Sequence, residues 1–302
     1  MKATETGGYL NTGGGRIYYE TRGAGPDLLL IHGYPFNSAD WQRVVPALAR
    51  DHRVILFDLP GLGYSDKPDA DVYSFAAYAR VVADLTAHLE IEAVDVLAHD
   101  LGVSVVQELL ARAQEGVREF SGAILRLRSV AFVNGGLFSD VYRPRWIQRL
   151  LSQSPDWFGA WLSRRIRRET VERNVRSLFG PNTQPDPKYL AEGWRILTHN
   201  DGRRVAYRIG RLIFEKRRHQ SRWIHAMRST ETPLAYICGP ADPNSGRHMA
   251  RRFREVLPDA PLYLLGEKIG HWPMLEAPSE FLAAYGRFRK TTGTGDCEAE
   301  RY

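Results

Sequence analysis

The most constraining feature of the sequence is a series of short apolar runs, most of them followed by a segment with helical spacing. Bounded runs of this kind are typical of strands buried on both faces of a parallel sheet, and parallel neighbours need a crossover, usually a helix. The pattern predicts an α/β protein with a mostly parallel sheet and helices on both faces. The predicted strands are Arg16–Thr21, Asp27–Gly33, His52–Leu59, Ala93–Ala98, Leu127–Val133, Leu234–Cys238 and Leu262–Leu265, and the predicted helices are Ser74–Leu89, Gly102–Ala113, Gly246–Leu257 and Ser279–Arg289.

The alternation stops between Leu137 and Glu231, where an Arg- and Trp-rich segment has helical spacing. This segment follows the fourth apolar run after the Gly-rich leader. Helices inserted at this point are expected to cover the carboxyl end of the sheet, where ligands bind in open α/β sheets. We therefore predict a core in two parts, 1–136 and 232–302, with a helical cap over 137–231. The glycines at 13–15 are expected to form a flexible leader, and the tail from Thr291 is expected to be frayed.

The charge of the chain is concentrated in the predicted cap. The whole chain carries +6, and residues 137–231 hold 20 Lys and Arg against 9 Asp and Glu. A solvated arginine-rich surface explains this block, and peripheral contact with an anionic membrane or an acidic partner is the alternative. We expect no nucleic-acid binding and a monomer or homodimer.

Localisation is predicted from what the sequence lacks. It has no apolar run of about 18 residues that could cross a membrane and no apolar region of a signal peptide near its start. Its two cysteines, Cys238 and Cys297, do not make a disulfide framework, so the expected compartment is the cytoplasm.

The sharpest chemical signal is AHDLG at 98–102, between a predicted strand and a predicted helix. It has the small-x-nucleophile-x-Gly form of a nucleophile elbow, with Asp100 in the place that Ser usually holds. The helix dipole favours a carboxylate at this position. An Asp before a helix is also a common N-cap, so the pentapeptide alone leaves both interpretations open.

Three further motifs supply partners for this carboxylate. HGYP at 32–35 follows a predicted strand, so the backbone amides of Tyr34 and Leu101 are expected to form an oxyanion hole. Asp242, in GPADP, and His271, in GHWP, each follow a later strand. The order nucleophile, acid, histidine is that of a hydrolase triad built at the ends of strands.

From about Gly14 to Tyr285 the chain resembles the α/β-hydrolase fold in its epoxide hydrolase/haloalkane dehalogenase branch. The resemblance rests on HGYP, AHDLG, GPADP and GHWP, together with DLPGLGYS at 58–65. Shorter pieces are similar to the mesoderm-specific-transcript type of this branch, and they are VVQELLAR (105–112), VNGGLF (133–138), LFGPNTQP (178–185), NDG (200–202) and RRHQSRW (217–223).

A carboxylate nucleophile determines the reaction class. Attack by Asp100 on an ester or amide carbonyl would give an anhydride with little gained, whereas attack on a saturated carbon gives an ordinary ester. His271, oriented by Asp242, then activates the water that hydrolyses this ester. Lipase, esterase and peptidase activities are therefore not expected.

The residues that stabilise the leaving atom distinguish the two activities of the branch, haloalkane dehalogenation and epoxide hydrolysis. Its dehalogenases carry a Trp after the nucleophile and often an Asn after His-Gly, where this chain has Leu101 and Tyr34. This chain thus lacks the two residues that bind the halide in those dehalogenases.

Its epoxide hydrolases protonate the opening ring oxygen with two cap tyrosines. The corresponding windows here hold Trp157-Phe158 and Leu212, which departs from the pattern. Tyr142 and Tyr207 are the nearest tyrosines, and with Trp157 and Trp272 they are the candidate ring-opening or pocket residues.

Three functions remain at this stage. An epoxide hydrolase that gives vicinal diols comes first, followed by another Asp-nucleophile hydrolase such as a haloalkane dehalogenase. The third is a non-catalytic ligand-binding or scaffold protein on the hydrolase fold. The expected partners are a small apolar electrophile and water. No cofactor or metal is expected, since the sequence has no zinc-ligand spacing and no phosphate- or dinucleotide-binding glycine motif.

Overall fold

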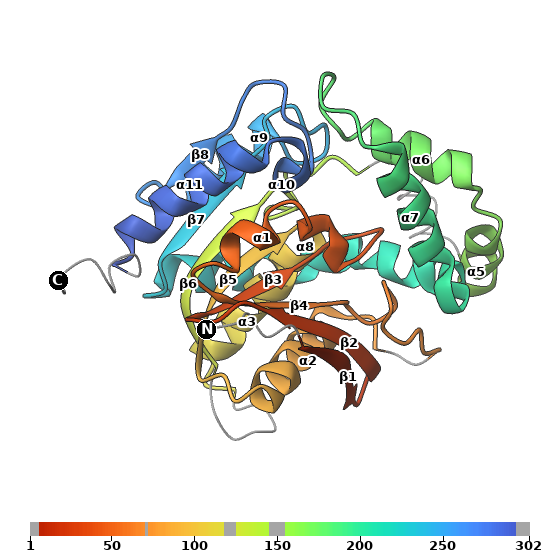
Figure 1. Ribbon diagram of the computed structural model, residues 1–302, viewed down its shortest axis with the longest axis horizontal. Coiled ribbons are helices and arrows are strands. Elements are labelled where there is room, and N and C mark those ends of the chain that lie inside the picture. Colours follow the sequence, from red (N-terminus) through yellow and green to blue (C-terminus); the bar gives the residue numbers. More distant parts are fainter. Residues whose placement is uncertain (1–5, 70–71, 118–124, 145–154, 294–302) are drawn as a thin grey trace.

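The computed structural model describes residues 6–69, 72–117, 125–144 and 155–293, and its centre is an eight-stranded sheet (Figure 1). The strand order is β1-β2-β4-β3-β5-β6-β7-β8. The strands from β4 to β8 in this order are parallel to one another, and β1-β2 and β2-β4 are antiparallel pairs. The strands are β1 (Thr6–Thr12), β2 (Gly15–Arg22), β3 (Asp27–Ile31), β4 (Arg53–Phe57), β5 (Ala93–His99), β6 (Arg126–Val133), β7 (Leu234–Cys238) and β8 (Leu262–Leu264).

The two faces of the sheet carry two hydrophobic clusters. Successive residues of β3 alternate between them, with Leu29 and Ile31 in one cluster and Leu28 and Leu30 in the other. This confirms the prediction of a continuously apolar strand covered on both sides. One face packs on α2 (Phe75–His88), α3 (Leu101–Gln114) and α9 (Arg247–Val256), and the other on α1 (Val45–Leu48), α10 (Pro273–Glu276) and α11 (Pro278–Thr291).

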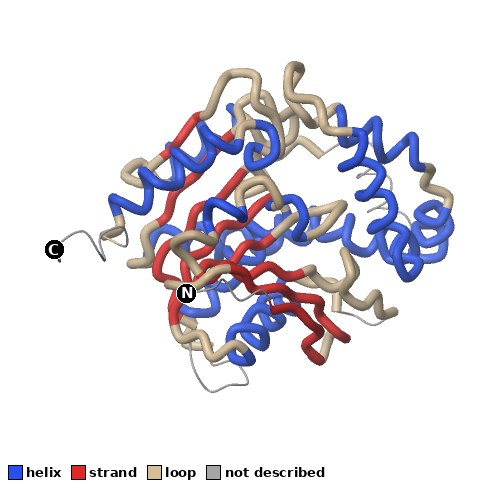
Figure 2. Tube along the Cα trace, viewed as in Figure 1, coloured by secondary structure: helices blue, strands red, loops and turns tan. Residues whose placement is uncertain are grey.

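A group of helices interrupts the sheet between β6 and β7. The elements of this insertion that the structure describes are α5 (Asp156–Arg164), α6 (Arg168–Arg176), α7 (Pro187–Thr198), the 3₁₀ segment η2 (His199–Val205) and α8 (Ala206–Ser229). Figures 1 and 2, drawn in the same view, show α5, α6 and α7 lying to one side of the strands.

Helix α8 belongs to both parts of the molecule. Its C-terminal half packs on α3, where the Trp223 indole donates to Glu108 at 2.9 Å and Arg222 bonds the same carboxylate at 2.6 Å. A cap that ends at residue 231 therefore includes a segment whose side chains belong to the core.

The predicted flexible leader is wrong for the described residues. Thr6–Thr12 forms β1, which pairs antiparallel with β2 across a turn at Gly13 and Gly14. The strand escaped prediction because its side chains are mostly exposed or half-buried and show no apolar pattern, so backbone hydrogen bonds hold it in the sheet. At the other end α11 continues to Thr291, and residues after 293 lie outside the described part. No helix among the described residues is long and apolar enough to span a membrane.

The packing of α8 on the core gives a stability prediction. Replacing the fully buried Trp223 with Ala should lower the free energy of unfolding by about 3–5 kcal/mol, because it leaves a cavity and removes a donor to Glu108. Replacing the exposed Trp157 with Ala should change it by less than about 0.5 kcal/mol. Equilibrium urea unfolding measures both, and equal losses would contradict the assignment of Trp223 to the core.

Candidate active site

The turn between β5 and α3 holds Asp100 in a backbone conformation that non-glycine residues rarely adopt, with φ 47° and ψ −104°. Its carboxylate makes no capping hydrogen bond to α3, although Asp100 stands at the N-cap position. Oδ2 instead accepts a hydrogen bond from the backbone amide of Tyr34 at 3.1 Å. The side chain is thus aimed away from the helix, which disfavours the N-cap interpretation.

Close backbone approaches surround the turn. A Cβ on Gly33 would lie 2.4 Å from Cβ of Asp100, and one on Gly135 would lie 2.7 Å from Cα of Asp100. Gly135 also has φ +109°, which side chains rarely tolerate. These positions leave no room for a larger residue, so the strained conformation of Asp100 is fixed from two sides.

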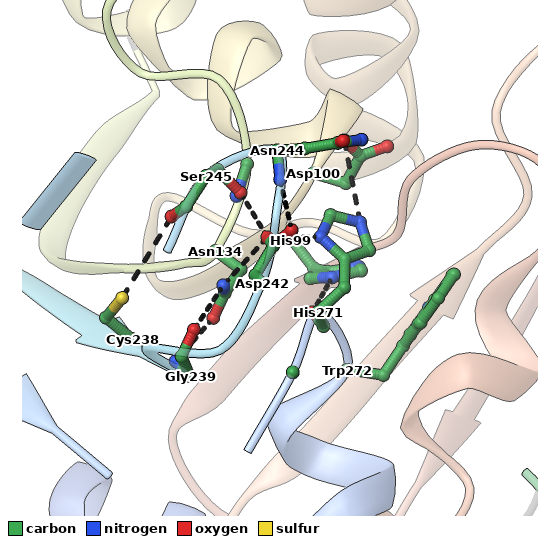
Figure 3. Close-up of polar contacts among 12 residues, drawn as sticks. His99, Asp100, Asn134, Cys238, Gly239, Asp242, Asn244, Ser245, His271 and Trp272 are labelled. Carbon is green, nitrogen blue, oxygen red and sulfur yellow. Dashed lines mark hydrogen bonds and ion pairs between the residues drawn. The ribbon is translucent and has the colours of Figure 1, made fainter. Parts of the chain in front are cut away.

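His271 lies between the two carboxylates (Figure 3). Nδ1 is 2.7 Å from Oδ2 of Asp242, and Nε2 is 3.8 Å from Oδ1 of Asp100. The imidazole is only 3% exposed and the Asp242 carboxylate is fully buried. Asp100, His271 and Asp242 follow β5, β8 and β7, so the structure brings together the three residues that the sequence places after strands.

Asp242 has further partners that sequence reasoning missed. Its Oδ2 also accepts hydrogen bonds from the Asn134 amide at 3.0 Å and from the Ser245 hydroxyl. Oδ1 accepts the backbone amide of Asn244 at 2.8 Å. Asn134 directly follows β6, so its position at a strand end was a signal available in the sequence. These donors keep the acid ionised and fix its orientation.

The charges of the site shift its pKa values in opposite directions. Burial alone would raise the pKa of Asp242, but the His271 imidazole and the hydrogen bonds of Ser245 and Asn134 hold it well below the usual range. Burial alone would lower the pKa of His271, but Asp242 and, to a smaller extent, Asp100 raise it to about 9. The imidazole is therefore protonated at neutral pH, and the Asp242 carboxylate is ionised.

The loop that carries His271 is fastened to the insertion. The His271 backbone amide donates to the carbonyl of Leu178 at 2.9 Å. Oε2 of Glu276 accepts the amides of Gly180 and Gly270, both at 2.8 Å. The histidine is thus positioned by a segment that precedes α7 as well as by its own loop.

A cavity of about 400 Å³ lies in front of Asp100 and His271. Tyr34, Leu101 and Tyr142 line it, so three of the predicted site residues besides the pair itself border the same space. Most of its remaining wall is apolar and comes from α5, α6 and α8. The wall residues from these helices are Leu162, Thr170, Val171, Asn174, Val175, Ile209, Gly210, Ile213 and Lys216.

Three of the candidate pocket residues do not line this cavity. Tyr207 is buried, and its hydroxyl oxygen accepts a hydrogen bond from Arg208 at 3.0 Å. Trp157 is 73% exposed on α5, because the first turn of that helix faces outward. Trp272 lies behind His271, edge-on to the imidazole, and its indole donates to Asp40 at 3.2 Å. The expectation that these side chains border the pocket is thus corrected by their positions.

Comparisons with known proteins identify the family of the chain. The sequence profile of the alpha/beta hydrolase family matches residues 28–284. The chain belongs to the α/β hydrolase family. The mesoderm-specific transcript protein of Mus musculus is 33% identical over 291 residues, which cover 94% of this chain and 85% of that protein. The "Putative hydrolase LipZ" of Mycobacterium tuberculosis is 34% identical over 279 residues, which cover 92% and 93%.

The same fold is found among solved structures. The epoxide hydrolase CorEH superposes with a TM-score of 0.75 at 22% identity, covering 95% of this chain and 99% of that one. This confirms the predicted α/β-hydrolase fold, and the similarity to mesoderm-specific transcript proteins confirms the resemblance drawn from the short motifs.

The effect of the two carboxylates on the pKa of His271 gives a second prediction. Asp242→Asn should lower the pKa of His271 by roughly 1 to 3 pH units, because it removes the nearest negative charge. Asp100→Ala should lower it by less, and Asp259→Asn, at an exposed position, should leave it unchanged. NMR titration of the imidazole measures each value. A larger shift in the Asp100 variant than in the Asp242 variant would contradict the ordering.

Proposed function

We propose that this α/β hydrolase uses Asp100 as a nucleophile on saturated carbon and that its most favoured activity is epoxide hydrolysis to vicinal diols. The observation that carries the proposal is the geometry of Asp100. Its backbone is strained, and its carboxylate faces His271 and makes no capping hydrogen bond to α3. A carboxylate in this place is suited to forming an ester with an alkyl carbon rather than to attack on a carbonyl.

In the first step, Oδ1 of Asp100 is the attacking atom. Oδ2 already accepts the Tyr34 amide, so the other oxygen is available to a substrate in the cavity. A ring carbon of the epoxide bonds to Oδ1, and the carbon–oxygen bond of the ring breaks. The product of this step is an alkyl ester of Asp100 with a hydroxyl on the neighbouring carbon once the released oxygen takes a proton.

In the second step, the same site hydrolyses the ester. Esterification removes the negative charge of Asp100, so the pKa of His271 falls and the imidazole can give up its proton to act as a base. Water then loses a proton to Nε2 and adds to Cγ of Asp100. The oxyanion forms beside the Tyr34 amide, and the amide of Leu101 is the second expected donor.

The cavity supports an apolar substrate. Its wall is largely aliphatic, and Tyr142 borders it as a polar group that could contact a ring oxygen. A haloalkane is less favoured, since Leu101 and Tyr34 occupy the places where dehalogenases of the branch hold their halide. A binding or scaffold function would not require the three catalytic side chains or the four donors that hold Asp242.

The covalent mechanism is tested by a single turnover in water labelled with heavy oxygen. With enzyme in excess over styrene oxide, label should enter the carboxylate of Asp100, because the water oxygen adds to Cγ and the original oxygen leaves with the diol. Mass analysis of the peptide that contains Asp100 measures the incorporation. A diol formed without label in this peptide would mean that Asp100 does not form the ester.

The matched control is His271→Gln. This variant should form the ester but not hydrolyse it, so its Asp100 peptide should gain the mass of the whole epoxide and no label from water. A panel of aliphatic and aromatic epoxides beside bromoalkanes then separates epoxide hydrolysis from dehalogenation.

A further inference from the structure

The cavity wall includes a buried lysine that makes no ion pair with a carboxylate in the part of the chain that the structure describes. Lys216 is 4% exposed and stands on the face of α8 that also presents Ile209 and Ile213 to the cavity. Its ammonium nitrogen lies 3.4 Å from the carbonyl oxygen of Gly136, which is a long contact. Within the described residues it forms no ion pair with a carboxylate, so most of its three donors remain unused.

The surroundings of Lys216 are otherwise apolar or aromatic. The nitrogen is 5.6 Å from the ring centre of Tyr142 and 5.9 Å from that of Phe75. A Cβ on Gly136 would lie 2.9 Å from this nitrogen, so the glycine leaves space for the ammonium group. The other cations on the cavity wall, Arg165 and Arg167, are exposed side chains.

A buried ammonium that forms no ion pair destabilises a fold, so its place in the same cavity as Asp100 calls for a functional reason. We propose that Lys216 is a catalytic residue that donates a proton to the oxygen released when Asp100 opens the substrate ring. The assignment rests on the proposed function and places the acid in the wall that the epoxide would face. It also supplies the donor that the displaced cap tyrosines leave missing, since Leu212 lies in the core one helical turn before Lys216.

The protons of the reaction balance with this assignment. When Oδ1 of Asp100 bonds to carbon, the electron pair of the broken bond goes to the ring oxygen, which takes a proton from the ammonium of Lys216. After esterification, His271 gives its resting proton to solvent and becomes a neutral base. In hydrolysis, one proton of water passes through His271 to the departing diol oxygen, and His271 takes a proton back from solvent once the carboxylate of Asp100 is restored. The other proton leaves the new carboxylic acid of Asp100 and restores the ammonium of Lys216.

Electrostatics suit this role. Burial lowers the pKa of Lys216 to about 8, although the negative charge of Asp100 acts to raise it. A donor whose pKa lies near neutrality gives up its proton readily and is still largely protonated at pH 7. The titratable or charged groups that share its cavity are Asp100, His271, Tyr34, Tyr142 and the two arginines.

The test follows ester formation in the His271→Gln background, where the adduct accumulates. Intact-protein mass spectrometry measures the rate with styrene oxide, a neutral probe, so any role of Lys216 in holding an anionic substrate does not enter. Adding Lys216→Met should slow adduct formation by about 100-fold or more. Arg217→Met, at an exposed position on the same helix, is the matched control and should leave the rate unchanged.

Two further readouts separate catalysis from structure. With Lys216 present, adduct formation should slow as the pH rises above about 8, and this alkaline limb should vanish in the methionine variant. The melting temperature of Lys216→Met should rise, because the variant removes a buried unpaired charge. A lysine that only supported the fold would lower the melting temperature instead.

The outcomes distinguish the two proposals. If His271→Gln forms no adduct with any epoxide of the panel, the proposed function fails and this assignment fails with it. If the adduct forms and Lys216→Met changes neither its rate nor its pH dependence, only the role of Lys216 is overturned. A change confined to the half-saturating epoxide concentration also overturns proton donation, because it would mark Lys216 as a binding residue.

Discussion

The proposed chemistry depends on the strained turn that holds Asp100. A residue with φ 47° is kept in place because Gly33, in the loop after β3, and Gly135, in the loop after β6, lie in close contact with the turn. Relaxation to an ordinary N-cap would give the carboxylate to the amides of α3 and take it away from His271. In the proposed mechanism, this strained conformation is what makes Asp100 a nucleophile and not a helix cap.

A second constraint is the pair of carboxylates on either side of His271. One imidazole lies between Asp242, whose pKa is held well below its usual range, and Asp100. The resting site holds the histidine in its charged form. In the proposed mechanism, bond formation at Asp100 removes one of the two negative charges and releases the base function of His271, so the positions of these charges set the order of the two steps.

Much of this arrangement could be predicted from the sequence, for a physical reason. Strands buried on both faces must be continuously apolar, so Asp27–Ile31 and Leu234–Cys238 are visible as runs, and the residues that follow them must meet at one edge of the sheet. Side-chain direction is less visible. The sequence does not tell that Trp157 faces solvent, that Tyr207 turns from the cavity, or that Lys216 points into it, because helix spacing gives a face without saying what that face meets.

The hydrogen bonds between the insertion and the His271 loop have a consequence for chimeras in which the insertion is exchanged between related proteins. The carbonyl of Leu178 and the amide of Gly180 form hydrogen bonds that position the loop of His271. The C-terminal end of α8 packs in the core through Trp223. A chimera joined at 137 and 231 would replace all of these contacts at once. Donor segments that stop before Leu178 would change only the part of the cavity wall that α5 and α6 supply. They would leave native both the contacts that hold the His271 loop and the part of the wall on α8 that carries Lys216.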